Sequence, residues 1–475
     1  MVQSTPFSSL TELSNAVASG DIGPVELTES YLSRIEALDG KLNAFRTATP
    51  ERALDEARAA ESMLAKGQTL GPLHGLPYAA KDLYDVAGLP TSAGAKVLEG
   101  AIAEHDCDTV RQLRQRGMVL LGKTNTVQFA YGGVGINHDH GTPHNPWNET
   151  PCAPGGSSSG SGVAVAAGMA PMALGTDTGG SVRIPAALCG ISGLKTTVGR
   201  VSRAGVYPLS WSLDSVGPLA RSVEDTALVY EAITGEEPGD SSTHGATAQR
   251  VRHQLDGDIR GLRIGIARTA FFDGVASEVV DAIEATAQVF EERGAQVVDV
   301  DFAHAQRALD LNPRGLIISA EAYTLNRDLV DNRFDELDPA VAHRVIKGKD
   351  VSAHEYLANV RQWEQLRADC IQSMRDLDVL LAPSTRWTGQ PIATIDASSE
   401  SYSEYNLGYL RNTSIGNVLN LCGLSVPCGF DSDGMPIGLM IYGKPFDEAT
   451  VLRAGHAYQC DTNWHVQTPS LDWLA

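Results

Sequence analysis

Cysteine is scarce in this sequence and is not spaced to bind a metal or to form a disulfide framework. None of the seven cysteines forms a Cys-x-x-Cys pair, and they stand at positions 107, 152, 189, 370, 422, 428 and 460. An odd number without a regular spacing indicates reduced thiols. Because reduced thiols persist in the cytoplasm, we expect a cytoplasmic protein.

A leader and long apolar runs are also missing. The first twenty residues, MVQSTPFSSLTELSNAVASG, have neither the basic start nor the apolar core of a secretory signal. No stretch approaches the roughly 20 apolar residues that a membrane-spanning helix needs. We therefore expect no association with a membrane.

Positive charge is in short supply, since 37 Lys and Arg stand against 58 Asp and Glu, for a net charge of −21. Such a surface opposes direct binding to nucleic acid or to an anionic membrane, and its simplest meaning is solubility. Aromatic residues make up only 6% of the chain, whereas glycine occurs 47 times. With 475 residues available to bury a large core, this mixture is typical of an α/β enzyme with tight turns.

The stretch from Ala153 to Thr197 holds two clusters of serine and glycine, at 155–162 and 178–181, joined by an apolar run. Glycine allows the backbone to approach a neighbouring group closely, so the clusters indicate a site rather than a linker. The pattern between them predicts a short helix over 159–168 and a buried strand over 171–176.

Ser181 is the candidate nucleophile of the second cluster. It follows a Gly-Gly turn and precedes a helix predicted to begin at Ile184, with Pro185 near its first turn. Free backbone N–H groups around such a serine can stabilise an oxyanion. The predicted oxyanion hole is therefore the turn of Thr178, Gly179, Gly180 and Ser181.

A serine nucleophile needs a base, which is commonly a histidine. Ser181 does not lie in a Gly-x-Ser-x-Gly motif, because no glycine stands two positions after it. A buried lysine can serve instead, since loss of hydration lowers the pKa of its amine. Lys81 is favoured because it ends the nearly uncharged run Leu76–Ala80, whereas the rival Lys123 has more polar neighbours.

Three histidines, His138, His140 and His144, lie in one loop and raise the possibility of a metal site. No set of carboxylates or cysteines accompanies them in the sequence. We therefore expect no metal, and we favour a loop that lines the mouth of the active site.

Four motifs together resemble the amidase signature family. They are GLPYAAKD at 75–82, GGSSSGSG at 155–162, GTDTGGSVRIPAALCGISGLKTTVGRVSR at 175–203 and SLDSVGPLARSVED at 212–225. The similarity continues weakly into NVLNLCGLSVPCGF at 417–430, so it covers nearly the whole chain. Such an ordered set is far more specific than any single glycine motif.

The resemblance implies a Ser–cisSer–Lys triad that needs no cofactor or metal. Ser181 would be the nucleophile, Lys81 the base, and Ser157 the bridging serine that follows a cis Gly156–Ser157 peptide bond. The separation of 24 residues between the serines is the family's. Ser159, where the family more often has glycine, leaves these roles intact. Three more residues align with positions that brace the two loops: Ser158, Asp177 and Arg183.

The fold expected for residues 1–475 is a single α/β domain, the amidase signature fold, with a mixed and mostly parallel sheet flanked by helices. Residues 1–66 are predicted to form a helical cover. Residues 310–376 are helical and charged, and the resemblance places such a layer near the substrate entrance, although a plain covering layer is the alternative. Further strands are predicted within 118–122, 261–268, 295–302, 377–385, 424–430 and 436–443.

Substrate choice is predicted to lie in this helical layer and in two shorter segments. Gly132 and Gly133 permit a close approach of the backbone, while Tyr131, Tyr207 and Trp211 can supply an apolar wall. The alternative is that these aromatic residues belong to the core.

The activity expected from the triad is hydrolysis of C–N bonds in small-molecule amides, including aryl amides and carbamates (a urethanase activity), through an acyl-enzyme. Such an enzyme would work as a monomer or homodimer without nucleic acid. The family also includes the glutaminase-like A subunit of tRNA-dependent amidotransferases, which the acidic charge and the atypical segment 387–417 make the second choice. A non-catalytic binding protein is a third possibility, which the presence of all three triad residues disfavours. The triad does not name the substrate.

Overall fold

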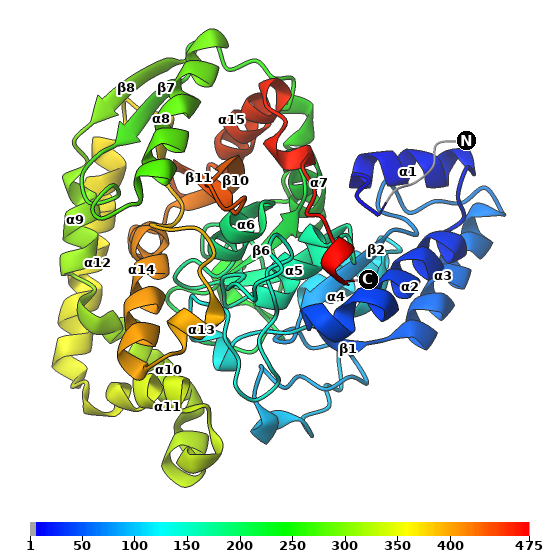
Figure 1. Ribbon diagram of the computed structural model, residues 1–475, viewed down its shortest axis with the longest axis horizontal. Coiled ribbons are helices and arrows are strands. Elements are labelled where there is room, and N and C mark those ends of the chain that lie inside the picture. Colours follow the sequence, from blue (N-terminus) through cyan, green and yellow to red (C-terminus); the bar gives the residue numbers. More distant parts are fainter. Residues whose placement is uncertain (1–5, 475) are drawn as a thin grey trace.

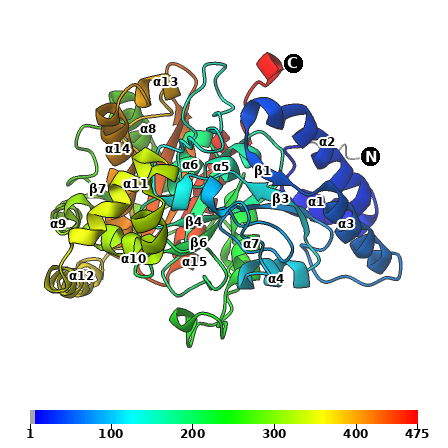
Figure 2. The same ribbon diagram turned by 90° about the horizontal axis from the view of Figure 1, so that it is seen from below.

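Eleven strands form one sheet in the computed structural model, which describes residues 6–474. Their order across the sheet is β1-β3-β2-β4-β6-β5-β10-β11-β9-β7-β8, and helices flank the sheet (Figures 1 and 2). Residues 1–5 and 475 of the predicted domain lie outside the described part. The chain is a single α/β domain with a large mixed sheet, as expected.

The strands vary in length from four to nine residues. Their bounds are β1 Phe45–Ala48, β2 Pro77–Lys81, β3 Val119–Thr124, β4 Met172–Asp177, β5 Ser192–Lys195, β6 Ser215–Ala220, β7 Arg263–Ala267, β8 Gln296–Val300, β9 Val379–Pro383, β10 Cys422–Phe430 and β11 Pro436–Gly443.

The α-helices range from one turn to more than five. Their bounds are α1 Leu10–Ser19, α2 Pro24–Leu42, α3 Pro50–Leu64, α4 Asp108–Gln115, α5 Ser159–Ala166, α6 Arg183–Cys189, α7 Val223–Ile233, α8 Ser277–Glu292, α9 Ala303–Asp310, α10 Leu316–Asn332, α11 Pro339–Val345, α12 Ala353–Ser373, α13 Ile392–Ile395, α14 Ser399–Val418 and α15 Glu448–Asp461.

Antiparallel pairs outnumber parallel ones in this sheet. Of the ten strand pairings within residues 6–474, four are parallel and six are antiparallel, so the expectation of a mostly parallel sheet needs correction. One antiparallel pair is the β10–β11 hairpin, which turns through residues 431–435 and lies between β5 and β9. A tight turn can join only antiparallel strands.

The N-terminal region, predicted as helical over 1–66, contains the strand β1 between α2 and α3. Asn43, with φ 51°, ends α2, and Pro50 begins α3. Six residues lie between these signals, and four of them form β1, which pairs with β3. So short a strand shows no periodic pattern in the sequence. At the other end of the chain, Lys41 Nζ of α2 donates to the Leu474 carbonyl at 2.8 Å.

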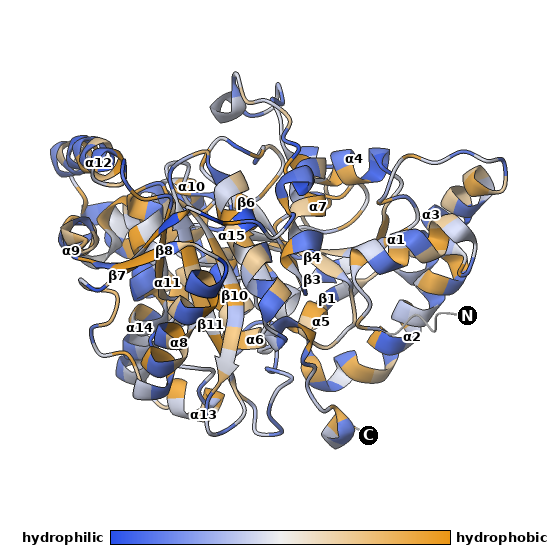
Figure 3. Ribbon diagram, turned by 90° about the horizontal axis from the view of Figure 1, so that it is seen from above, coloured by the Kyte–Doolittle hydropathy of each residue, from blue (hydrophilic) through white to orange (hydrophobic). Residues whose placement is uncertain are grey.

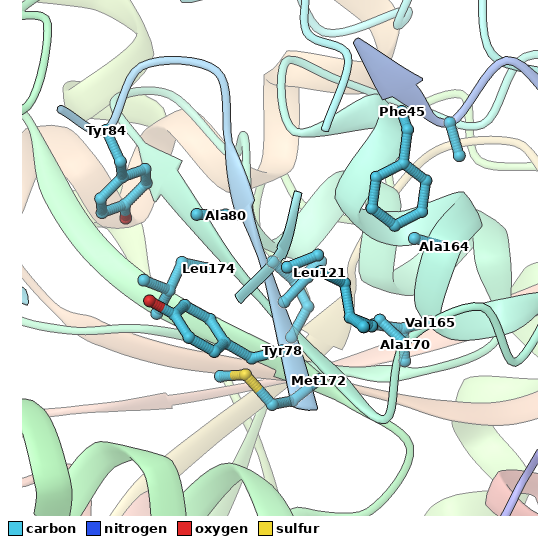
Figure 4. Packing of buried hydrophobic residues seen from close by; sticks show 14 of the residues in the cluster. Phe45, Tyr78, Ala80, Tyr84, Leu121, Ala164, Val165, Ala170, Met172 and Leu174 are labelled. Carbon is cyan, nitrogen blue, oxygen red and sulfur yellow. The ribbon is translucent and has the colours of Figure 1, made fainter. Parts of the chain in front are cut away.

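Strand β2 lies inside the core between β3 and β4. Figure 4 shows Tyr78 with Met172 and Leu174 on one side of this strand, and Ala164 and Val165 of α5 on the other. All five side chains are buried. Small residues in α5 let this helix approach the sheet, which places the serine cluster at its N-terminus beside the end of β2.

The segment 310–376 is largely helical, as predicted, and forms an outer layer of the molecule. Its longest helix, α12, is mostly hydrophilic in Figure 3 and buries only Asn359, Trp363, Leu366 and Cys370. All seven cysteines are unpaired. Among residues 6–474, no helix is both long enough and apolar enough to cross a membrane.

Candidate active site

Lys81 ends strand β2 with a side chain that is fully buried. Its Nζ donates to Ser157 Oγ at 2.7 Å and to Thr176 Oγ1 at 2.8 Å. Burial lowers the pKa of Lys81 to about 7, although the negative charges of Asp214 and Asp177 act to raise it. Both hydrogen-bond partners are neutral hydroxyls, so this amine can lose its proton near neutral pH and accept another.

Lys123, the rival base, is equally buried but has a different environment. Its Nζ lies 2.7 Å from Asp82 Oδ1 and donates to the Pro90 carbonyl at 2.9 Å. An ammonium that a buried carboxylate neutralises is a structural cation and a poor proton acceptor. The two lysines therefore differ in their contacts, and the choice of Lys81 as the base remains a prediction.

The first serine cluster wraps around the end of β2. The Gly156–Ser157 peptide bond is cis, which the resemblance implied. Gly156 N–H donates to the Gly133 carbonyl at 2.8 Å, so the loop is held from outside the cluster. Ser158 Oγ is 3.3 Å from both the N–H and the carbonyl oxygen of Thr176, which ties this loop to β4.

The second cluster turns from β4 into α6. No acceptor among residues 6–474 receives a hydrogen bond from the N–H groups of this turn, which comprises Thr178, Gly179, Gly180 and Ser181. Glycine is required at 180, where φ is 138° and a Cβ atom would lie 2.1 Å from Thr413 Oγ1. Thr413 Oγ1 donates to the Gly179 carbonyl at 2.6 Å, which orients the free N–H groups.

The buried ion pair of Asp177 and Arg183 supports the turn. Arg183 donates from Nε to Asp177 Oδ2 at 2.9 Å and from Nη2 to Oδ1 at 3.0 Å, and both side chains are fully buried. Asn417 donates to Asp177 at 2.8 Å, and Arg183 also donates to Tyr442 at 2.9 Å. Burial acts to raise the pKa of Asp177, but the charges of Arg183 and Lys195 and the hydrogen bonds from Arg183 and Asn417 together outweigh it and lower the pKa to about 2.

The two serines of the predicted triad are adjacent but are not joined through their hydroxyls. The Ser158 N–H donates to the Ser181 carbonyl at 3.2 Å, which brings the clusters together. Within residues 6–474, no hydrogen bond links Ser157 Oγ to Ser181 Oγ. Catalytic hydrogen bonds often tighten only when substrate binds, so this geometry is compatible with a relay.

A cavity of about 220 Å³ reaches the site through Thr176 and Thr178, whereas Lys81, Ser157 and Ser181 are not among its lining residues. Thr176 and Thr178 form part of its wall, together with the predicted pocket residues Tyr207 and Trp211. Trp211 is 45% exposed, so it is not a core residue. Tyr207 OH donates to Asn326 Oδ1 of α10 at 2.7 Å, which connects the cavity wall to the outer helical layer.

The other predicted pocket segment, Tyr131–Gly133, lies outside the lining of this cavity. Tyr131 is 9% exposed, and its OH is 2.9 Å from Ser319 Oγ of α10. The Arg344 guanidinium lies 4.9 Å from the centre of the Tyr131 ring. A Cβ atom on Gly133 would lie 2.8 Å from Leu410 Cγ, so this segment packs closely against α14.

The histidine loop forms a clamp between helices. His138 Nδ1 is 2.8 Å from Asp338 Oδ2 and its Nε2 is 3.1 Å from Asp396 Oδ2. The hydrogen bond with Asp338 is the main cause that raises the pKa of His138 to about 9, whereas burial lowers the pKa of His140 and of His144. In the described part of the chain, no three His, Cys, Asp or Glu side chains are grouped to hold a metal ion.

Several residues of the site were not predicted from the sequence. They contact the predicted residues from distant parts of the chain and are Thr176, Asp214, Glu321, Thr413 and Asn417. Thr176, Asp214 and Asn417 lie inside the quoted motifs, which was the one signal available for them. Thr178 Oγ1 donates to the buried Asp214 at 2.5 Å, and burial raises the pKa of this carboxyl.

Comparison with known proteins decides the family. The family model described as Amidase matches residues 26–452. The chain belongs to the amidase signature family. Its membership makes it an amidase-family hydrolase of C–N bonds, in agreement with the fold and with the expected reaction class.

The family relatives differ in what they are named for. The A subunit of the glutamyl-tRNA(Gln) amidotransferase of Chloroflexus aggregans (strain MD-66 / DSM 9485) is 40% identical over 96% of both chains. A solved structure from an inhibitor-bound vestigial complex of an s-triazine catabolic enzyme is 34% identical, with a TM-score of 0.89, over 95% of this chain and 98% of that one. The peptide amidase of Stenotrophomonas maltophilia is 31% identical, with a TM-score of 0.84, over 98% and 99%.

These comparisons correct the expected function. The curated relatives with about 40% identity over nearly the full chain are named as one component of an amidotransferase, so the preference for a small-molecule amide or carbamate hydrolase was wrong. The expectation of a monomer or homodimer without nucleic acid falls with it, because those relatives are subunits named for a tRNA. Net charge misled the prediction, since it describes this chain's surface and not that of an assembly.

Proposed function

We propose that this chain is the A subunit of a tRNA-dependent amidotransferase and hydrolyses glutamine to supply ammonia. The observation that carries the proposal is 40% identity, over 96% of both chains, to a protein named as the A subunit of a glutamyl-tRNA(Gln) amidotransferase. The buried hydroxyl and amine groups around Ser181 support a glutaminase reaction of the Ser–cisSer–Lys type.

In the proposed reaction, Ser181 Oγ attacks the side-chain amide carbon of glutamine. Ser157 accepts the Ser181 proton and passes its own to neutral Lys81, whose Nζ lies 2.7 Å from Ser157 Oγ. The C–N bond breaks as Ser157 returns a proton to the leaving nitrogen, which departs as ammonia. Water then hydrolyses the acyl-enzyme by the same relay and releases glutamate.

The tetrahedral intermediate carries a negative oxygen that needs hydrogen-bond donors. We assign this role to the turn whose N–H groups have no acceptor within residues 6–474: Thr178, Gly179, Gly180 and Ser181. Loss of one such donor costs about 3 to 4 kcal/mol in other enzymes. Ser158, Asp177 and Arg183 would hold the donors in place through the contacts described above.

The proposal includes protein partners in the cytoplasm. The ammonia would pass to partner subunits that amidate glutamate attached to tRNA. Because this chain carries a net charge of −21, we assign tRNA binding to the partners rather than to the chain itself. The substrate pocket within this chain would involve Tyr207 and Trp211 around the cavity, with the segment Tyr131–Gly133 nearby.

The test is ammonia release from glutamine by the chain co-expressed with the other amidotransferase subunits. We expect activity in the complex, and its loss by several orders of magnitude in Ser181→Ala, because the nucleophile is removed. Ser373→Ala, on the outer helix α12, is the matched control and should leave the rate unchanged. Failure to copurify with the partners, together with hydrolysis of other primary amides but not of glutamine, would overturn the proposal.

A further inference from the structure

Glu321, on α10, is a fully buried carboxylate held by hydrogen bonds. Among the described side chains of residues 6–474, which exclude that of Arg314, no ion pair includes Glu321. Four donors surround it instead. Ser212 donates from N–H at 3.1 Å and from Oγ at 2.5 Å, Tyr356 OH donates at 2.5 Å, and Ser210 Oγ also donates to this carboxylate. An ionised carboxylate accepts four such bonds and donates none.

Three of these four bonds come from the two residues that flank Trp211. Ser210 and Ser212 belong to the loop between β5 and β6, whereas Glu321 is more than 100 positions away. Trp211 itself projects into the wall of the 220 Å³ cavity. The Glu321 carboxylate of α10 therefore binds this loop at Ser210 and at Ser212, on either side of the exposed Trp211.

A chain of hydrogen bonds continues from Ser210 to the Thr178–Ser181 turn. The Ser210 N–H donates to Asp214 Oδ2 at 2.9 Å. The other oxygen of Asp214 accepts from Thr178 Oγ1 at 2.5 Å. Ser210 thus binds Glu321 with its hydroxyl and Asp214 with its backbone, so a displacement of the loop moves both contacts together.

We infer that Glu321 is a positioning residue that orients the Thr178–Ser181 turn through Ser210 and Asp214. It touches neither the nucleophile nor the predicted path of the substrate. Its effect on the reaction is geometric, since a small misplacement of oxyanion donors weakens their hold on the developing charge. The inference rests on Ser181 as the proposed nucleophile, but it does not depend on the identity of the substrate.

The experiment measures the rate at which phenylmethanesulfonyl fluoride labels Ser181 in the folded protein, a reaction that needs the nucleophile and the oxyanion donors but no glutamine. Glu321→Gln replaces one acceptor oxygen with an amide that faces the donors, so we expect labelling to slow by about 10- to 100-fold. Ser210→Ala cuts the same link from the loop side and should slow labelling in the same direction. Ser210→Ala also tests the inference if Glu321→Gln does not fold.

Two further variants separate positioning from general stability. Tyr356→Phe removes one Glu321 partner but leaves the Ser210 contact that leads to Asp214, so it should keep the labelling rate within about threefold. Thr178→Val already breaks the chain of hydrogen bonds. Adding Glu321→Gln to it should therefore reduce the labelling rate little further. The inference is overturned if folded Glu321→Gln and Ser210→Ala are labelled at the wild-type rate. It is also overturned if Glu321→Gln slows labelling by the same factor in Thr178→Val as in the wild type. If Glu321→Gln slows labelling but the enzyme does not hydrolyse glutamine, the proposed function is wrong and the inference about Glu321 stands.

Discussion

At the scale of single residues, the partners of a buried lysine determine what it can do. Among residues 6–474, three lysines have fully buried side chains: Lys81, Lys123 and Lys195. Lys123 pairs with a carboxylate, and Lys195 donates to two backbone carbonyls at 2.9 Å. Lys81 alone donates to two hydroxyls, one of which is the bridging Ser157. Burial also lowers the pKa of Lys195, so the contact with Ser157 is what makes Lys81 the amine suited to accept a proton.

The pH dependence of turnover should report the state of Lys81. Since burial lowers its pKa to about 7, the neutral amine forms as the pH rises through that value, and activity should rise with it to an alkaline plateau. Lys81→Ala should lose about 100- to 10,000-fold in kcat. Lys81→Arg should not recover it, because a guanidinium stays protonated. Initial rates across the pH range provide the measurement.

Lys123→Arg is the matched control for this prediction. An arginine can keep the ion pair with Asp82, so we expect this variant to retain activity with an unchanged acid limb. If Lys81→Arg is active with the wild-type pH profile, Lys81 is only a structural cation and the base must be sought elsewhere.

At the scale of elements, helix ends meet at the histidine loop. Asp338 caps the N-terminus of α11 and Asp396 follows the last residue of α13, and His138 lies between the two carboxylates. The loop therefore joins the outer helical layer to the segment before α14. This is a structural role for a histidine that the sequence presented as a candidate metal ligand.

The clamp should weaken at high pH. The hydrogen bond with Asp338 raises the pKa of His138 from 6.5 to about 9, so its contribution is fully present below about 6.5 and is lost as the pH rises through 9. His138→Gln should therefore lower Tm most near pH 6, with a deficit that shrinks by about pH 10. Thermal unfolding at several pH values tests this.

A second histidine provides the comparison. His244 is 87% exposed in its contact with Glu236, so His244→Gln should change Tm little at any pH. A His138→Gln deficit that is the same at every pH would show that the imidazolium charge contributes nothing to the clamp.

Periodic and glycine-rich elements were predictable from the sequence, whereas short internal strands were not. The helix α5 and the strand β4 lie where their patterns place them. β5 (SGLK) and β6 (SVGPLA) carry glycine or proline and have no clear alternation, so propensity gives no strand signal for them. These two strands pair antiparallel with each other, which contributes to the error about parallel pairing.

The site residues likewise differ in whether the sequence carries a distinctive pattern around them. Lys81, Ser157 and Ser181 each lie in a motif whose composition is unusual, so the sequence and the family resemblance bring them to attention. Thr176 lies inside a quoted motif without a signal of its own, and Glu321 is an ordinary residue of a helical segment. They matter only through contacts with residues 95 and 111 positions away, which a single sequence does not reveal.

At the scale of the whole molecule, acidic charge and proposed function have to be reconciled. A net charge of −21 repels a polyanion, yet the curated relatives are named for a tRNA-dependent activity. Division of labour within a complex resolves the conflict, because this chain would supply ammonia while another surface holds the tRNA.

This division predicts how tRNA binding responds to the partners. At about 150 mM salt the isolated chain should show no measurable binding to tRNA, and the co-expressed complex should bind it. Fluorescence anisotropy of labelled tRNA, with a salt titration of the complex, measures both. Tight, salt-sensitive binding by the isolated chain would contradict the assignment of tRNA to the partners.

The central hairpin has a consequence for how this protein is made. β10 and β11 lie between β5 and β9. They therefore join the half of the sheet formed by strands β1 to β6 to the half formed by β7, β8 and β9. They are also the last strands to leave the ribosome. A nascent chain that ends before Cys422 holds two half-sheets with open edges, which are exposed to aggregation.

The same hairpin completes the surroundings of the nucleophile. Arg183, which neutralises Asp177 beneath the turn, also donates to Tyr442 of β11. Until β11 has been synthesised, that guanidinium lacks one of its acceptors and the turn lacks its full support. The chain should therefore gain hydrolytic competence only after β11 has been synthesised.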